Sequence, residues 1–215
     1  MACSTFGRVR GRDFFVSRAG NPLKPINFLA GLLVIMSNDS DARIVEACLS
    51  GDRAAFRVLM DRYEKKMFNL AYRVVDDRED AMDATQTAFV KAYENLQTFD
   101  PSRKFFSWMY RILLNESLNI LKRRKRFDDL YEHATVESDN PEETYAAAET
   151  GQRIHKALME LKTDYRAVVV LRHYHDMSYK EIGEVVGISE KTIKSRLFSA
   201  RRQLKDILMR KGIVR

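Results

Sequence analysis

The chain has few of the residues that shape β-rich or disulfide-stabilised proteins. Of its 215 residues, four are proline, nine are glycine and two are cysteine. Strict alternation of polar and apolar side chains is also rare, and both facts favour an all-helical protein. Cys3 and Cys48 have neither CxxC spacing nor a neighbouring histidine. They therefore predict no disulfide framework and no metal site, which suits a protein of the reducing cytoplasm.

Long hydrophobic runs are missing as well. The apolar run at residues 28–36 is too short to span a bilayer, so no membrane-spanning segment is expected. It follows a polar, basic segment, as in a signal peptide, but no small-x-small cleavage site comes after it. Met36 is followed by SNDSDARIVEA, which is typical of the start of a first helix. Residues 1–36 are therefore interpreted as an N-terminal extension, either disordered or the product of a mis-assigned start.

Charge divides the rest of the chain. Lys and Arg number 37 and Asp and Glu number 30, and such a basic balance favours nucleic acid or an anionic membrane surface as partner. The basic block Lys122–Arg126 is followed at residues 127–150 by a segment with no Lys or Arg and with the helix-breaking pair Asn140-Pro141. This pattern predicts two small helical domains, at residues 37–126 and 151–215, joined by an acidic linker at 127–150.

Apolar residues spaced three and four apart predict four helices before the linker and four after it. The first group is expected at about 39–49, 52–75, 78–96 and 108–126. The second group is expected at about 152–161, 164–174, 178–187 and 189–210.

The last two helices have the features of a helix-turn-helix. Ser178 and Glu181 have the spacing of a capping box, and the turn Gly187-Ile188-Ser189 separates the helices. The final helix has one apolar stripe and an opposite basic face that could enter a DNA major groove. The plainer alternative is a solvated basic face on a helical bundle. The residues of the candidate reading face are Lys191, Thr192, Lys194, Ser195, Arg196, Phe198, Ser199, Arg201 and Arg202.

The helix WMYRILLNESLNILKRRKR carries a second unusual face. Trp108, Asn115 and Asn119 share it with cations, and aromatic, amide and cationic side chains together suit single-stranded or opened nucleic acid. Trp108 could equally be a core residue. A membrane-surface helix is disfavoured because Glu116 interrupts the apolar face. The candidate strand-opening residues are Arg103, Lys104, Phe105, Phe106, Trp108, Arg111, Asn115, Asn119, Lys122, Arg123 and Arg124.

These blocks together resemble a bacterial sigma factor of the extracytoplasmic-function (ECF) group. Gly51–Phe56 is similar to the opening of that family, and DAMDATQTAF at 80–89 is similar to its D-A-x-D-x-x-Q-x-x-F block. FSWMYRILLN at 106–115 resembles its F-x-[ST]-W-L-x-R-I-x-x-N block, and the helix-turn-helix residues match its C-terminal domain. The resemblance covers about residues 40–210.

The resemblance implies a role for each block. Asp80, Asp83, Gln86 and Phe89 would dock on the coiled coil of the largest subunit of core RNA polymerase. The chain as a whole would also contact the flap region of the polymerase. Asn115 would meet a flipped base of the −10 promoter element, and the final helix would read the −35 element. Lys194 and Ser199 stand where many members have arginine, which alters the chemistry offered to the bases at those positions.

The resemblance also implies partners. These are core polymerase, promoter DNA and an anti-sigma protein, with no cofactor and no small-molecule substrate, and the acidic linker would lie near the template path inside the polymerase.

Two other functions compete with this one. An ordinary helix-turn-helix regulator would account for residues 151–215, but it leaves the 80–89 block and the Asn115 face unexplained. An enzyme is disfavoured: His173 and His175 lack a third ligand, and side chains two apart on a helix point in different directions. No glycine-rich phosphate loop, GxSxG or HExxH motif occurs either.

Overall fold

The computed structural model describes residues 7–9, 12–14, 41–128 and 145–214. They fall into two compact units, Met1–Ser40 and Asp41–Arg215. In the first unit, β1 (Gly7–Val9) pairs antiparallel with β2 (Arg12–Phe14), a short hairpin that the composition does not predict. The interpretation of residues 1–36 as an extension otherwise lies outside the described residues.

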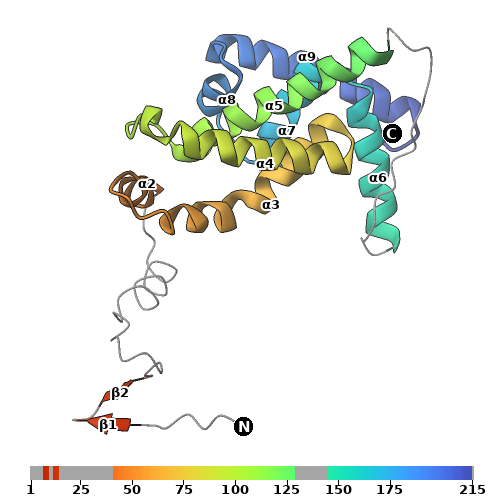
Figure 1. Ribbon diagram of the computed structural model, residues 1–215. Coiled ribbons are helices and arrows are strands. Elements are labelled where there is room, and N and C mark those ends of the chain that lie inside the picture. The colour runs from red at the N-terminus through yellow and green to blue at the C-terminus, as the bar shows by residue number, and fades with distance from the viewer. Residues whose placement is uncertain (1–6, 10–11, 15–40, 129–144, 215) are drawn as a thin grey trace. The chain divides into compact units, whose positions relative to one another are not determined.

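The second unit begins with a group of four helices and one 3-10 turn (Figure 1). They are α2 (Asp41–Leu49), α3 (Ala55–Val75), α4 (Arg78–Glu94), η1 (Leu96–Thr98) and α5 (Phe105–Asp128). Their positions match the sequence-based expectation within a few residues. Helix α3 starts later than expected because the Asp52 carboxylate accepts the Ala54 N–H at 3.0 Å, in the turn that precedes the helix.

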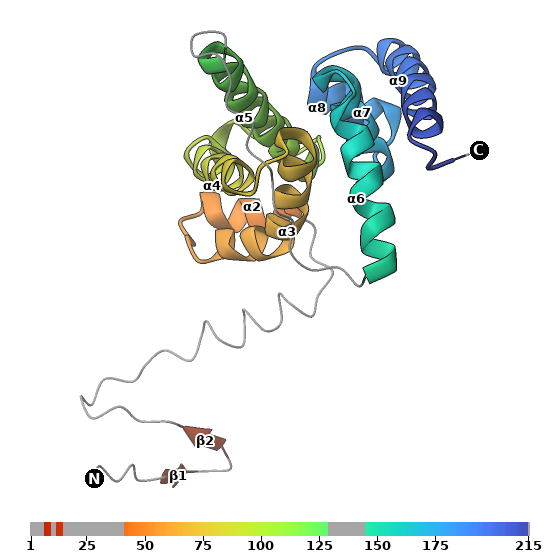
Figure 2. The same ribbon diagram turned by 90° about the vertical axis from the view of Figure 1, so that its right-hand side faces the viewer.

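A second group of four helices completes the chain (Figure 2). They are α6 (Tyr145–Met159), α7 (Thr163–His173), α8 (Tyr179–Val186) and α9 (Glu190–Arg210). Helix α6 starts seven residues before the predicted Gln152, since the alanine-rich stretch at 145–150 favours helix over linker. The rest of the acidic segment, residues 129–144, lies outside the described residues. The expected all-α class is confirmed, because every described element of this unit is helical.

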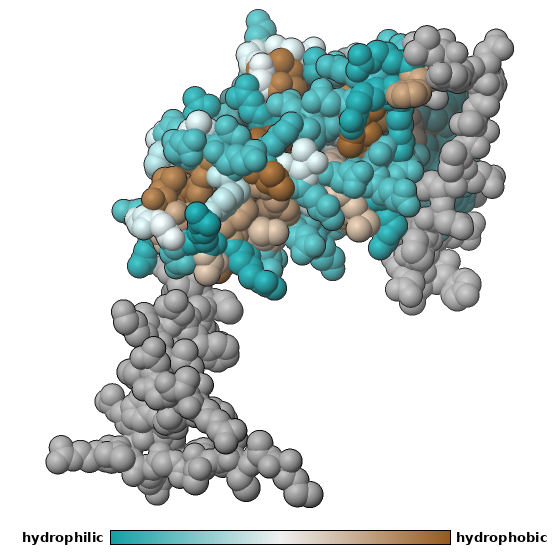
Figure 3. Space-filling model, viewed as in Figure 1, coloured by the Kyte–Doolittle hydropathy of each residue, from teal (hydrophilic) through white to brown (hydrophobic). Residues whose placement is uncertain are grey.

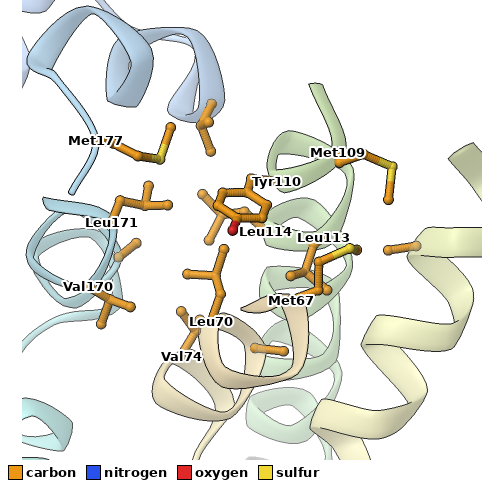
Figure 4. Close-up of a cluster of buried hydrophobic side chains, with 14 of the residues drawn as sticks. Met67, Leu70, Val74, Met109, Tyr110, Leu113, Leu114, Val170, Leu171 and Met177 are labelled. Carbon is orange, nitrogen blue, oxygen red and sulfur yellow. The ribbon is translucent and has the colours of Figure 1, made fainter. Parts of the chain in front are cut away.

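One buried apolar cluster runs through both groups of helices. Met67 and Leu70 of α3 meet Met109 and Leu113 of α5, and all four side chains are fully buried. Figure 4 shows that side chains of the second group, including Leu171, lie in the same cluster. The apolar stripes predicted from the sequence therefore form one core.

The surface is mainly polar in the view of Figure 3, with apolar patches. No helix in the described ranges is long and apolar enough to cross a membrane.

Candidate nucleic-acid interface

The helix-turn-helix has the local geometry that its sequence predicts. Ser178 Oγ accepts the Glu181 N–H at 3.2 Å, and the Glu181 carboxylate accepts the Ser178 N–H at 2.7 Å, which completes the capping box. Gly187 closes α8 with φ +77°, a left-handed conformation that favours glycine. Ser189 Oγ then accepts the Thr192 N–H and caps α9. The start of α9 is therefore held in a defined direction relative to α8.

The packing of α8 requires a glycine at position 183, which the sequence analysis did not single out. A Cβ atom at this position would lie 2.8 Å from the Ile188 carbonyl oxygen, closer than such atoms approach in proteins. Helix α8 can pack this tightly against the turn only because residue 183 has no side chain. The sequence does contain a signal for this requirement, because a glycine inside a short helix is unfavourable unless packing demands it.

Helix α9 presents most of the predicted reading face to solvent. Phe198 is 72% exposed, whereas its neighbour Leu197 is buried. A single exposed apolar side chain is common on protein surfaces, so Phe198 supports the reading face only together with the cations around it. The other exposed members of this face are Lys191, Thr192, Lys194, Ser195, Arg201 and Arg202.

Two members of the predicted reading face depart from this pattern. Arg196 and Ser199 are half-buried. The Arg196 guanidinium lies 3.7 Å from the Asp164 carboxylate at the start of α7. In this structure Arg196 therefore contacts α7, which leaves less of the guanidinium free to contact DNA.

A pocket of about 290 Å³ lies beside the candidate strand-opening residues of α5, between α4, η1 and α5. It brings together Trp108 and Asn115, two of the residues that the sequence placed on one face of α5, whereas Asn119 does not line it. It adds side chains that the sequence did not indicate, from α4, from the turn after it and from α5. We call it the capture pocket; its lining residues are Lys91, Asn95, Thr98, Trp108, Ile112, Asn115 and Glu116.

Hydrogen bonds hold the wall of the capture pocket that faces Asn115. Lys91 Nζ lies 2.7 Å from the Glu116 carboxylate and links α4 to α5. Asn95 Nδ2 donates to the Lys91 carbonyl at 2.8 Å, and Thr98 Oγ1 donates to the Asn95 carbonyl at 2.7 Å. The Asn115 side chain is exposed and has no hydrogen-bond partner within the described ranges. Its amide is thus free for a ligand, while its surroundings are fixed.

Trp108 serves both the core and the pocket. It is half-buried, and its ring lies 5.6 Å from Phe99 and 5.7 Å from Phe105, centroid to centroid. Its remaining surface lines the capture pocket. Phe105 is only 2% exposed, so it supports the indole from beneath. Phe106 is half-buried.

Comparison with known proteins gives the family. Residues 59–127 match sigma-70 region 2, and residues 151–204 match sigma-70 region 4. The RNA polymerase sigma-H factor of Pseudomonas aeruginosa is 31% identical over 81% of this chain and 96% of its own length. The ECF RNA polymerase sigma factor SigW of Bacillus subtilis is 34% identical over 73% of this chain and 92% of its own length. The chain belongs to the ECF group of the sigma-70 family.

Solved structures agree with this ECF fold. CnrH, solved in complex with the cytosolic domain of CnrY, superposes with a TM-score of 0.62 at 29% identity, covering 79% of this chain and 97% of CnrH. The sigma factor RpoE of Bartonella quintana, solved in complex with the anti-sigma factor NepR, superposes with a TM-score of 0.64 at 24% identity. It covers 72% of this chain and 96% of RpoE, and at that identity it supports the fold alone.

The cations of α5 in this ECF chain divide into exposed and internally paired groups. Arg111, Asn119, Lys122 and Arg123 are exposed. Arg124 is half-buried and makes ion pairs with Asp77 and Asp80 at the start of α4, so it ties the two helices together. In the loop before α5, Arg103 lies 3.5 Å from Asp100 and Lys104 lies 2.6 Å from Glu181 of α8.

Only part of the 80–89 block of α4 is exposed to solvent in this ECF factor. Asp83 and Gln86 are exposed, but Phe89 is 5% exposed and belongs to the core. Asp80 is engaged with Arg124. Met82 and Val90, which the sequence reading overlooked, are 44% and 56% exposed on the same helix. The accessible part of the block is therefore two polar groups bordered by two apolar side chains.

His173 and His175 were weighed as metal ligands in the sequence. No cluster of His, Cys, Asp and Glu suited to a metal ion occurs among the described residues. Burial, aided by Arg73 and Lys66 nearby, lowers the pKa of His175 to about 4, so its ring is neutral at physiological pH. Its ring packs edge-on against Tyr110 with centroids 5.2 Å apart. His175 is therefore a packing residue.

Proposed function

We propose that this ECF factor binds core RNA polymerase, reads the −10 and −35 promoter elements and helps to open the DNA, without catalytic chemistry of its own. The observation that carries this proposal is the pairing of two different DNA-facing surfaces on one chain. One is a capped recognition helix, α9, shaped for the major groove. The other is the capture pocket, of about 290 Å³, with the Asn115 amide and the Trp108 ring in its wall.

The two surfaces have different roles in promoter opening. Helix α9 anchors duplex DNA through base edges and phosphates at the −35 element. The capture pocket binds a base that has left the stack at the −10 element, with Asn115 reading its edge and Trp108 offering an aromatic wall. The binding free energy of the extruded base offsets part of the cost of unpairing. Exposed cations of α5 hold the neighbouring phosphates.

An independent helix-turn-helix regulator is the alternative that the chain disfavours. Such a protein needs only the α6–α9 group and would bind its operator alone. Residues 59–127, which contain the capture pocket, match sigma-70 region 2.

A gel-shift experiment with promoter DNA separates the two functions. A sigma factor needs core polymerase to retard the DNA, whereas a shift of equal strength without polymerase supports the regulator.

The polymerase contact is proposed to include the exposed part of α4. Asp83 and Gln86 offer polar groups, and Met82 and Val90 offer apolar area beside them.

Core polymerase acts in the cytoplasm, where we place this factor. An anti-sigma partner is also proposed, supported by the family to which the chain belongs.

Reversing the charge at Asp83 tests the polymerase surface. We expect Asp83→Lys to weaken binding to core polymerase by about fivefold or more, because opposed like charges replace an attraction at the rim of an interface. Binding is measured by fluorescence anisotropy of labelled factor titrated with core enzyme. Asp61→Lys is the matched control, since Asp61 is an exposed carboxylate on a different helix, α3. Equal loss for both variants would remove Asp83 from the surface.

Lys194→Ala tests the recognition helix. Lys194 is exposed near the start of α9, where it pairs with Glu190 at 3.0 Å, one turn earlier, and its Nζ lies 5.9 Å from the centroid of the Tyr179 ring. A base or phosphate contact there is worth roughly 1–3 kcal/mol, so we expect about 5- to 150-fold weaker affinity of the polymerase complex for −35 DNA. Lys205→Ala, about three turns further along α9, is the control. Unchanged affinity and unchanged promoter choice for Lys194→Ala would exclude this side chain as a reader.

A further inference from the structure

A second pocket, of about 380 Å³, lies between α3, α5 and the loop that joins α7 to α8. It is larger than the capture pocket and shares no lining residue with it. Its volume falls near the lower end of the range for small-molecule sites, which is about 300–1,000 Å³. We call it the second pocket; its lining includes Lys66, Arg73, Phe106, Tyr110, Tyr174 and His175.

Two cations of the second pocket have no acidic partner. Lys66 and Arg73 lie about two turns apart on α3, which puts them on one side of that helix. Neither forms an ion pair with any residue in the described ranges. Lys66 is exposed, and the Arg73 guanidinium lies 4.0 Å from the centroid of the Tyr174 ring. The pocket therefore has a positively charged edge that can hold an anion.

His175 adds a polar atom that the protein leaves unsatisfied. Its ring packs against Tyr110, but its Nε2 is buried and has no hydrogen-bond partner among the described residues. The neutral ring, whose pKa is lowered to about 4 by burial, Arg73 and Lys66, can carry a proton on Nε2 and donate it to an anion. A buried polar atom without a partner at a pocket is a reason to look for a ligand that supplies one.

Aromatic side chains form much of the remaining wall. Phe106 is half-buried, and Tyr174 is 41% exposed. Tyr110 lies beside Phe106 with centroids 6.0 Å apart, and burial raises its pKa to about 12, so its hydroxyl stays neutral. Planar rings such as nucleobases stack on aromatic side chains. The wall therefore favours a ligand that contains a planar ring.

Asp176 brings one negative charge to the same pocket. It is exposed and has φ +51°, in the left-handed region. A carboxylate accepts hydrogen bonds from hydroxyl and amino groups, and proteins that bind dinucleotides use one to hold ribose hydroxyls. The pocket thus suits a ligand with an anionic end, a planar ring and hydrogen-bond donors. A nucleoside phosphate has all three.

We propose that the second pocket of the free factor binds a free nucleoside phosphate as a regulatory ligand. Lys66 and Arg73 hold the phosphate, and the aromatic wall holds the base. His175 Nε2 donates to the phosphate, and Asp176 accepts from the sugar or the base. None of these groups reacts with the nucleotide, so it is neither a substrate nor a cofactor. The inference goes beyond the proposed promoter function and does not depend on it.

Calorimetric titration of the full chain, without polymerase or DNA, tests the site. The probes are the mono- and triphosphates of adenosine, guanosine, cytidine and uridine, together with the four nucleosides and inorganic phosphate. We expect at least one nucleotide to bind with a Kd below about 100 μM, and roughly tenfold or more tighter than its nucleoside or inorganic phosphate. Binding of no nucleotide, or of none more tightly than inorganic phosphate, would overturn the proposal.

Lys66→Ala tests the phosphate contact, with Lys65→Ala as the matched control. Both are exposed lysines of α3, but only Lys66 lines the second pocket. Each variant removes one positive charge, so non-specific attraction of an anion weakens equally in both. We expect about fivefold or greater loss of nucleotide affinity in Lys66→Ala and little change in Lys65→Ala. Equal losses would mean that the nucleotide is not held in this pocket.

The pKa of His175 reports where the nucleotide binds. A phosphate beside the ring offsets the charges of Arg73 and Lys66, which help to lower that pKa to about 4. Saturating nucleotide should therefore raise the His175 pKa towards its ordinary value. NMR titration of the imidazole signals measures this change, and His175→Gln identifies the signal. An unchanged pKa at saturation would contradict the assigned site.

A DNA strand is the other source of a nucleoside phosphate, and a short oligothymidylate separates the two. We expect free nucleotides to bind with the stated dependence on Lys66. If only the oligothymidylate binds in a way that depends on Lys66, the pocket holds part of a strand and the proposal of a free ligand is wrong. Because no step uses polymerase or a promoter, each outcome is independent of whether the chain initiates transcription.

Discussion

Asn115→Ala is expected to reduce promoter opening by roughly 5- to 150-fold while leaving binding to closed duplex promoter nearly unchanged. The amide is exposed, lines the capture pocket and has no hydrogen-bond partner in the described part of the chain. Loss of a well-placed contact to a base edge costs about 1–3 kcal/mol. Opening is measured by permanganate reactivity of thymines near the −10 element, and closed binding is measured by gel shift at low temperature.

Asn69→Ala is the matched control for this experiment. Asn69 is an exposed asparagine of α3 that does not line the capture pocket. We expect it to retain opening within about twofold of the native factor, because surface substitutions away from a site usually change free energies by no more than about 0.5 kcal/mol. Equal loss of opening and of closed binding in Asn115→Ala would count against base capture.

Gly183→Ala is expected to destabilise the helix-turn-helix by roughly 1–3 kcal/mol, the usual cost of forcing an extra methyl group into a packed site. The new Cβ would meet the Ile188 backbone oxygen at 2.8 Å, and a backbone atom cannot move aside as a flexible side chain can. The turn must shift, and with it the direction of α9. We therefore expect weaker binding of the polymerase complex to the −35 element as well as a lower free energy of unfolding.

Guanidinium unfolding followed by circular dichroism measures the stability part of this prediction. Lys180→Ala is the control, since Lys180 is exposed on the same short helix and alanine favours helix. A Gly183→Ala protein as stable as the control would mean that the turn relaxes at little cost.

Local chemistry made the helices and the helix-turn-helix predictable. A capping box, a turn glycine with positive φ and an N-terminal serine act within a few residues of one another, so they can be read from the chain alone. The period of α5 likewise placed Trp108 and Asn115 on one face, and the structure has both lining one pocket.

Contacts between distant segments were not predictable in the same way. Lys91, Asn95 and Thr98 reach the capture pocket only because α4 and η1 pack beside α5, and nothing in their own sequence signals it. The period of α9 placed Phe198 on its exposed face, as the structure has it, but no local pattern indicated that Phe105, at the start of α5, is buried. Arg166 of α7 is the strongest case. It is 9% exposed and donates to the Val74 carbonyl of α3 at 2.7 Å, but a buried arginine cannot be told from a surface arginine in the sequence.

In vitro transcription is the most direct test of the central claim. Core RNA polymerase, purified free of other sigma factors, is incubated with and without the full chain on a library of promoter fragments from the genome that encodes it. We predict discrete, promoter-specific transcripts that appear only when the factor is present and that are lost with Asn115→Ala. An unchanged transcript pattern, with no promoter-specific product at any factor concentration that saturates core enzyme, would contradict the account.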